Sequence, residues 1–203
     1  MQPLRTLSFG EFLEAVGSKT PAPGGGAVAS AAGALAAALA RMVVAYSEGK
    51  KSLAEHEPLL QRAALMLSRT IDLLLELATE DAQAYGLVNE LMRLPEGDLR
   101  RISELPLAAD AAVQAPRSVC AVCCDLMRLL ESLQPRTNRH LRSDLAIAAV
   151  LAEAAAKAAW WNVFVNLPLI DDETRRAAIQ EELGRMLDEA AARCNTIEAA
   201  CKA

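Results

Sequence analysis

The chain has 203 residues and a formal net charge of −5, and 53% of its residues are hydrophobic whereas only 3% are aromatic. This length suits a single domain, residues 1–203, whose core must be built mainly from Ala, Leu and Val. The acidic balance argues against general binding to nucleic acid. No apolar segment of the signal-peptide type follows the N-terminal residues, so the expected location is the cytoplasm.

About six helices and no strand are predicted, which makes the fold all-α. In chain order the helices are expected over residues 8–16, 27–47, about 58–93, 98–133, 143 or 144–166, and from 171–173 nearly to 203. Ala and Leu in such excess favour helix. The expected architecture is a multihelical bundle.

Local signals mark several of these helix ends. Ser8 and Glu11 have the spacing of a capping box, and the same spacing recurs in 52–55 before Pro58, which suits a first helical turn. Asp98 is the expected N-cap of the fourth helix. Pro106 and Pro116 are expected to kink or split that helix.

Two of the helices are unusually rich in Ala. Residues 27–40 and 144–159 carry small or apolar side chains on almost every face, which predicts burial on all sides at the centre of the bundle. Residues 20–40 carry no charge, but two Pro, three Gly and the following Arg41 favour a buried helix over a membrane span. So much Ala and Leu must be covered that a homodimer is expected, with two long helices paired antiparallel across a two-fold axis.

The most informative stretch is Thr20-Pro-Ala-Pro-Gly-Gly-Gly26, directly before a helix. Glycines let a ligand approach the main chain, and the following helix begins with unpaired N–H groups. The loop lacks the Gly-Lys-Ser/Thr ending of a P-loop, and no strand precedes it as a dinucleotide fingerprint requires. It therefore predicts a binding edge for the polar rim of a small molecule, and a simple helix-entry loop is the alternative.

The five cysteines are Cys120, Cys123, Cys124, Cys194 and Cys201. The odd number indicates reduced thiols. The first three lie in an apolar helical run with no tight turn between them, so core packing is favoured over zinc binding.

A few polar residues interrupt the apolar pattern. Asp144 heads an apolar helix and follows a loop rich in Arg, while Asn162 and Asn166 share one face at the other end of that helix. Eighteen residues separate Asp144 from Asn162, which is about 27 Å of helix, so the two cannot touch the same reacting atom. Asp81 follows another apolar run, with Tyr85 on its face. Helix capping and a solvated helix face are the ordinary alternatives for these residues.

In this order, these segments resemble the cyclodeaminase family, which includes the cyclodeaminase half of formiminotransferase-cyclodeaminase and stand-alone methenyltetrahydrofolate cyclohydrolases. The resemblance spans most of the chain. It is carried by the loop 20–26, Met42-Val43, Gly49-Lys50, Asp81-Ala82 with Tyr85, Arg93-Leu94-Pro95, Asn138 with Arg142-Ser143-Asp144-Leu145, and Asn162-Val163 with Asn166-Leu167. One departure is Ala27, where family loops usually carry Ser.

The resemblance implies an all-helical dimer that binds a tetrahydrofolate derivative without metal or other cofactor. It either cyclises 5-formimino-tetrahydrofolate with release of ammonia or hydrolyses 5,10-methenyl-tetrahydrofolate. Asp144 is the first candidate for the catalytic carboxylate and Asp81 the second. The candidate substrate-binding residues are Pro23, Gly24, Gly25, Gly26, Asn138, Arg142, Ser143, Asn162 and Asn166. An inactive folate-binding or structural helical dimer of the same fold is the alternative.

Overall fold

The computed structural model describes residues 4–202, and within that range the chain is helical with no strand, which confirms the all-α prediction. The α-helices are α1 (Phe9–Gly17), α2 (Gly25–Ala45), α3 (Glu57–Met92), α4 (Leu99–Leu133), α5 (Arg142–Asn166) and α6 (Glu173–Lys202). Short 3-10 helices lie at η1 (Leu4–Thr6), η2 (Lys51–His56), η3 (Gln134–Arg136), η4 (Arg139–Leu141) and η5 (Leu167–Leu169).

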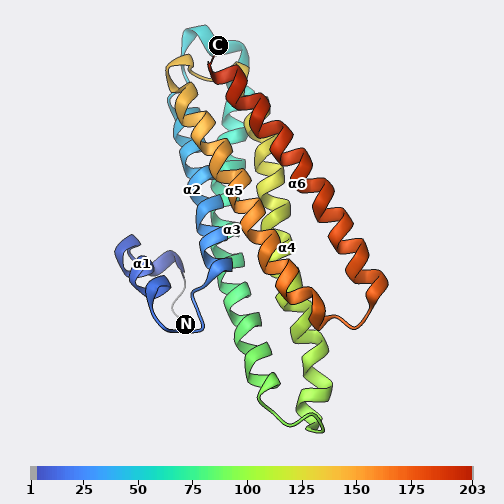
Figure 1. Cartoon of the computed structure of the whole chain (residues 1–203). Coiled ribbons are helices and arrows are strands. Elements are labelled where there is room, and N and C mark those ends of the chain that lie inside the picture. The colour runs from blue at the N-terminus through green and yellow to red at the C-terminus, as the bar shows by residue number, and fades with distance from the viewer. Residues whose placement is uncertain (1–3, 203) are drawn as a thin grey trace.

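Helices α2, α3, α4 and α5 form a bundle in which each packs along the next and α5 closes against α2 (Figure 1). Helix α6 lies along α4 and α5. The short α1 projects from the side of the bundle near the beginning of α2. Helices α2 and α5 run in opposite directions, so the start of α2 and the end of α5 lie at the same level.

Several local predictions hold. The capping box of Ser8 and Glu11 is present in both directions, and the carboxylate of Asp98 accepts hydrogen bonds from the backbone N–H groups of Arg100 and Arg101. Gly49, which follows the predicted end of the second helix at residue 47, has a φ of 71°, a left-handed conformation that suits glycine, although α2 itself ends at Ala45. These signals held because they depend on neighbouring residues alone.

Other boundaries differ from prediction. Helix α2 begins at Gly25, within the glycine run, and residues 51–56 form η2 instead of an N-cap for α3. The expected cap at Ser143 or Asp144 is wrong, because α5 begins at Arg142 and Asp144 lies in its first turn. The prolines do not split α4, which continues from Leu99 to Leu133. Tertiary packing on α3, α5 and α6 holds that helix together despite the lost backbone donors.

The core is packed at short backbone separations. A Cβ added to Gly33 of α2 would lie 2.9 Å from the Sγ of Cys123 and 3.1 Å from a methyl group of Leu74. Cys120, Cys123, Cys124 and Cys194 are buried free thiols, which confirms the core interpretation. Within residues 4–202, no group of three or more His, Cys, Asp or Glu side chains is arranged to hold a metal ion.

Helix α2 is long and apolar enough to span a membrane by length and composition, yet more than half of its apolar window is packed inside the bundle. The prediction that α2 and α5 are buried on all sides is nevertheless wrong for a single chain. Each presents one apolar strip outward, with exposed side chains at Val28 and Leu35 of α2 and at Ile147, Val150 and Trp161 of α5. The apolar α2–α5 face, as we call these two strips, covers the outer side of both helices.

Candidate active site

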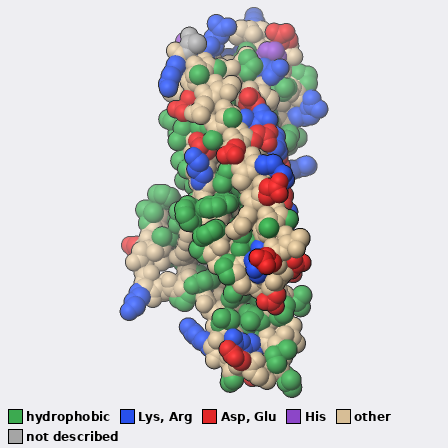
Figure 2. All heavy atoms as spheres, turned by 45° about the vertical axis from the view of Figure 1, so that its right-hand side comes forward, with side chains coloured by type: hydrophobic (Ala, Val, Ile, Leu, Met, Phe, Trp, Pro, Cys, Tyr) green, Lys and Arg blue, Asp and Glu red, His purple; other side chains and the backbone are tan. Residues whose placement is uncertain are grey.

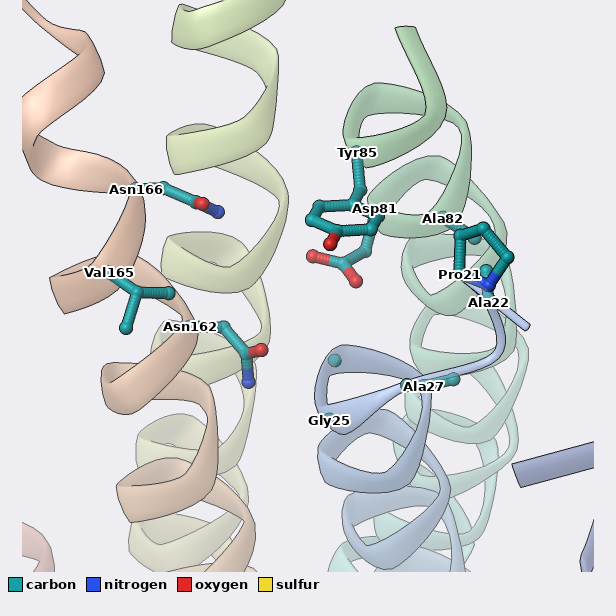
Figure 3. A pocket seen from close by; sticks show the side chains of 12 residues that line it. Pro21, Ala22, Gly25, Ala27, Asp81, Ala82, Tyr85, Asn162, Val165 and Asn166 are labelled. Carbon is teal, nitrogen blue, oxygen red and sulfur yellow. The ribbon is translucent and has the colours of Figure 1, made fainter. Parts of the chain in front are cut away.

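A cavity of about 230 Å³ lies where the beginning of α2, the middle of α3 and the end of α5 meet (Figure 3). It brings together residues that are distant in sequence, since α2 contributes the glycine loop, α3 a carboxylate and α5 two amides. The lining residues are Pro21, Ala22, Gly24, Gly25, Gly26, Ala27, Asp81, Ala82, Tyr85, Asn162, Val165 and Asn166.

The glycine loop forms the floor of this cavity because a side chain there would have no space. A Cβ on Gly26 would overlap the carboxylate of Asp81, and one on Gly25 would lie 3.2 Å from the Oδ1 of Asn162. The backbone N–H groups of Gly25, Gly26 and Ala27 have no acceptor among the described residues, as expected for the first turn of a helix. The loop is therefore a close-fitting edge that also offers donors.

Asp81 is the only carboxylate that lines the cavity within residues 4–202. Burial, which disfavours the charged form, raises the pKa of Asp81 to about 6. No hydrogen bond or ion pair from the described residues offsets this effect. The ring of Tyr85, one helical turn further along α3, lies over the carboxylate in Figure 3. A half-buried acid with a pKa near neutrality is able to take up and release a proton at physiological pH.

Asn162 and Asn166 line the opposite wall from consecutive turns of α5. The Nδ2 of Asn162 donates to the carbonyl of Ala158 at 2.9 Å, and the Nδ2 of Asn166 donates to the carbonyl of Ala112 in α4 at 2.8 Å. A carbonyl only accepts, so these bonds identify the amide nitrogens and leave each Oδ1 available for other donors. With Asp81, the side chains on the two walls form a set of acceptors that suits a ligand rich in N–H groups.

The other predicted residues lie at the far end of the bundle. Asn138, Arg142, Ser143 and Asp144 surround the beginning of α5, about 27 Å along that helix from Asn162. Asn138 shapes its own turn, since its Oδ1 accepts from the N–H of His140. It also borders a hollow of about 470 Å³ whose lining includes Lys50, His56, Arg139 and His140.

One chain therefore brings together the glycines, Asp81 and the asparagine pair, but it does not bring Asp144 to them. Pro23 does not line the cavity, whereas Pro21 does. Sequence reasoning also left Tyr85, Ala82 and Val165 out of the candidate site. Only Tyr85 gave a usable signal, because it lies four residues after Asp81 and shares its face.

Known proteins similar to this chain share its fold and include the segments that form the cavity. A model of the formiminotransferase-cyclodeaminase family matches residues 8–185. The chain belongs to this family. The match includes the glycine loop, Asp81, Asp144 and both asparagines, so the family assignment covers every candidate residue.

Individual family members align with nearly the whole chain. The chain is 32% identical to the formimidoyltransferase-cyclodeaminase of Gallus gallus over 92% of the chain's own length, but it spans only 35% of that relative. It is 31% identical to the methenyltetrahydrofolate cyclohydrolase of Methylorubrum extorquens, covering 89% of each chain. The crystal structure of formiminotetrahydrofolate cyclodeaminase from Thermotoga maritima superposes with a TM-score of 0.91, at 33% identity and 98% coverage of both chains.

Proposed function

We propose that this chain is a tetrahydrofolate one-carbon enzyme. It either cyclises 5-formimino-tetrahydrofolate to 5,10-methenyl-tetrahydrofolate with release of ammonia, or hydrolyses 5,10-methenyl-tetrahydrofolate to the 10-formyl form. The observation that carries the proposal is the half-buried Asp81 above Gly26 in a cavity walled by two amides. The proposal is supported by two relatives, one named as a cyclodeaminase and one as a cyclohydrolase, each of which aligns with most of this chain.

The chemistry requires a group that moves protons at a carbon flanked by nitrogens. In the cyclisation, N10 attacks the formimino carbon and loses a proton, and the departing nitrogen gains one as ammonia leaves. In the hydrolysis, water adds to the methenyl carbon and loses a proton before the ring opens. A carboxylate with a pKa near 6 serves both steps, because it accepts the first proton and can return it to the leaving nitrogen.

Asn162 and Asn166 orient the substrate in this proposal. Their free amide oxygens accept from N–H groups of the ligand, and Gly24, Gly25 and Gly26 let its ring approach the main chain. The cavity of about 230 Å³ is below the roughly 300–1,000 Å³ of pockets that enclose a drug-sized ligand. It therefore holds one end of the folate, and the remainder extends beyond it.

We further propose that the enzyme is a homodimer formed through the apolar α2–α5 face. Among the exposed side chains of α2 and α5, both fully described, only Arg41 and Lys157 are charged. Trp161 and Val165 are 59% and 64% exposed on this face. Figure 2 shows hydrophobic side chains gathered at mid-height and several Lys and Arg at the upper end. An uncovered face of this kind marks an association surface.

An antiparallel dimer would also bring the two groups of candidate residues together. Ala154 lies one residue past the midpoint between Asp144 and Asn162 on α5, and its small exposed side chain permits close approach at a two-fold axis. Rotation about an axis there would bring the partner's Asp144 to the level of Phe164, about 3 Å along α5 from Asn162. The cationic hollow around Lys50 and Arg139 would then lie near the cavity that holds Asp81.

We also place residues 1–203 in one domain and the enzyme in the cytoplasm, where buried thiols such as Cys120 stay reduced.

The direct test is a pair of absorbance assays on 5-formimino- and 5,10-methenyl-tetrahydrofolate, together with calorimetric titration by tetrahydrofolate. Turnover of the first compound identifies a cyclodeaminase, and turnover of the second alone identifies a cyclohydrolase. Binding without turnover of either would mean a folate-binding protein. Neither binding nor turnover would overturn the proposed function.

A further inference from the structure

Pro116 lies in the middle of α4 and is buried there. In a regular helix the N–H of residue 116 would donate to the carbonyl of Ala112, four residues earlier, but proline has no N–H. The Nδ2 of Asn166 donates to that carbonyl instead, at 2.8 Å. A site residue of α5 thus takes the place of a backbone donor that α4 lacks.

Asn162 is held in a different way. Its Nδ2 donates to the carbonyl of Ala158, four residues earlier in the same helix. That carbonyl already has the backbone N–H of residue 162 as its helical partner. The side-chain hydrogen bond of Asn162 therefore stays within α5, whereas that of Asn166 is made to a carbonyl of α4 that lacks its backbone donor.

We propose that Pro116 is a positioning residue for Asn166. Because it leaves the Ala112 carbonyl without a backbone donor, that buried carbonyl binds the Asn166 amide nitrogen and leaves the amide oxygen as the free acceptor of the side chain. A donor on the substrate then meets an acceptor of fixed orientation. This inference rests on the proposed function insofar as Asn166 contacts the folate.

The substitution Pro116→Ala restores the backbone N–H. The Ala112 carbonyl regains its helical donor, and the amide of Asn166 becomes free to turn its NH2 group toward the cavity. We expect the KM and the dissociation constant for tetrahydrofolate to rise about three- to tenfold, as for the loss of one hydrogen bond, with kcat changed much less. Pro106→Ala is the matched control, since the Ile102 carbonyl accepts no side-chain hydrogen bond from the described residues.

A double-mutant cycle decides whether Pro116 acts through Asn166. In the Asn166→Ala background, Pro116→Ala should weaken tetrahydrofolate binding no further. The same added loss in both backgrounds, or an equal loss in Pro106→Ala, would show that Pro116 acts in some other way and would overturn the proposal.

Thermal unfolding tests the coupling without any ligand, so it separates this proposal from the proposed function. Asn166→Ala should lower the Tm when residue 116 is Pro, because a buried carbonyl then loses its donor. It should leave the Tm almost unchanged when residue 116 is Ala. Equal decreases in both backgrounds would overturn the positioning role even if the enzyme binds folate. If the Tm values show the coupling but the chain binds no folate, Pro116 still positions the Asn166 amide, and it is the proposed role of Asn166 in folate binding that is wrong.

Discussion

Replacing Asp81 by Asn tests both the electrostatics and the chemistry of the site, because it keeps the size of the side chain and removes its charge. If Asp81 transfers the proton, kcat should fall by roughly a hundredfold or more. Tetrahydrofolate binding should change much less. The neighbouring Glu80→Gln is the control, since Glu80 immediately precedes Asp81 in α3, is exposed and lies outside the cavity.

The same variant should be more stable than the wild type, but only above a certain pH. Burial raises the pKa of Asp81 to about 6, whereas the pKa of an Asp side chain in the unfolded chain is about 4. Between these values the folded protein holds a proton that the unfolded chain has lost, so stability falls as pH rises through this window. A difference of two pKa units lowers the free energy of unfolding by roughly 3 kcal/mol at most, and partial solvation of the carboxylate reduces this effect to about 2 kcal/mol.

Thermal unfolding at pH 4 and pH 8, at one protein concentration, measures the difference. A gain of about 2 kcal/mol corresponds to a rise of roughly 4–8 °C in Tm for a chain of this size. Asp81→Asn should show this rise at pH 8 and little of it at pH 4, and Glu80→Gln should show neither. An equal effect at both pH values would refute the desolvation argument. Unchanged turnover in Asp81→Asn would exclude it as the proton carrier and move the assignment to Asp144.

Four further outcomes follow from the site and the apolar face. Wild-type kcat should decline below about pH 6, because the attack by N10 requires the ionised form of Asp81; a flat profile from pH 5 to 8 would contradict this. Gly26→Ala should lower activity at least tenfold by displacing the carboxylate, whereas Gly86→Ala, whose Cβ meets nothing within 4 Å, should retain activity. Mixing refolded Asp81→Asn and Asp144→Asn chains should recover about a quarter of wild-type activity if each site uses both subunits, and no recovery would place each site within one chain. Val150→Glu should give a monomer by light scattering, and an unchanged mass would locate the interface elsewhere.

The sequence by itself determined the helical class and most of the helix positions. These predictions succeeded where the signal is local. The capping of α1 by Ser8 and the N-cap at Asp98 depend on a few adjacent residues. The Ala-rich pattern of residues 27–40 likewise predicted a place at the centre of the bundle, where Gly33 contacts Cys123 and Leu74 closely.

Only the tertiary structure decided which candidates meet. Sequence reasoning ranked Asp144 above Asp81 because its motif was more distinctive, but motif strength carries no information on distance. The antiparallel packing of α2 and α5 brings Gly26 and Asn162 to the level of Asp81, and the length of α5 keeps Asp144 about 27 Å away. The raised pKa of Asp81 and the bond from Asn166 to α4 arise from packing between helices, which no single segment encodes.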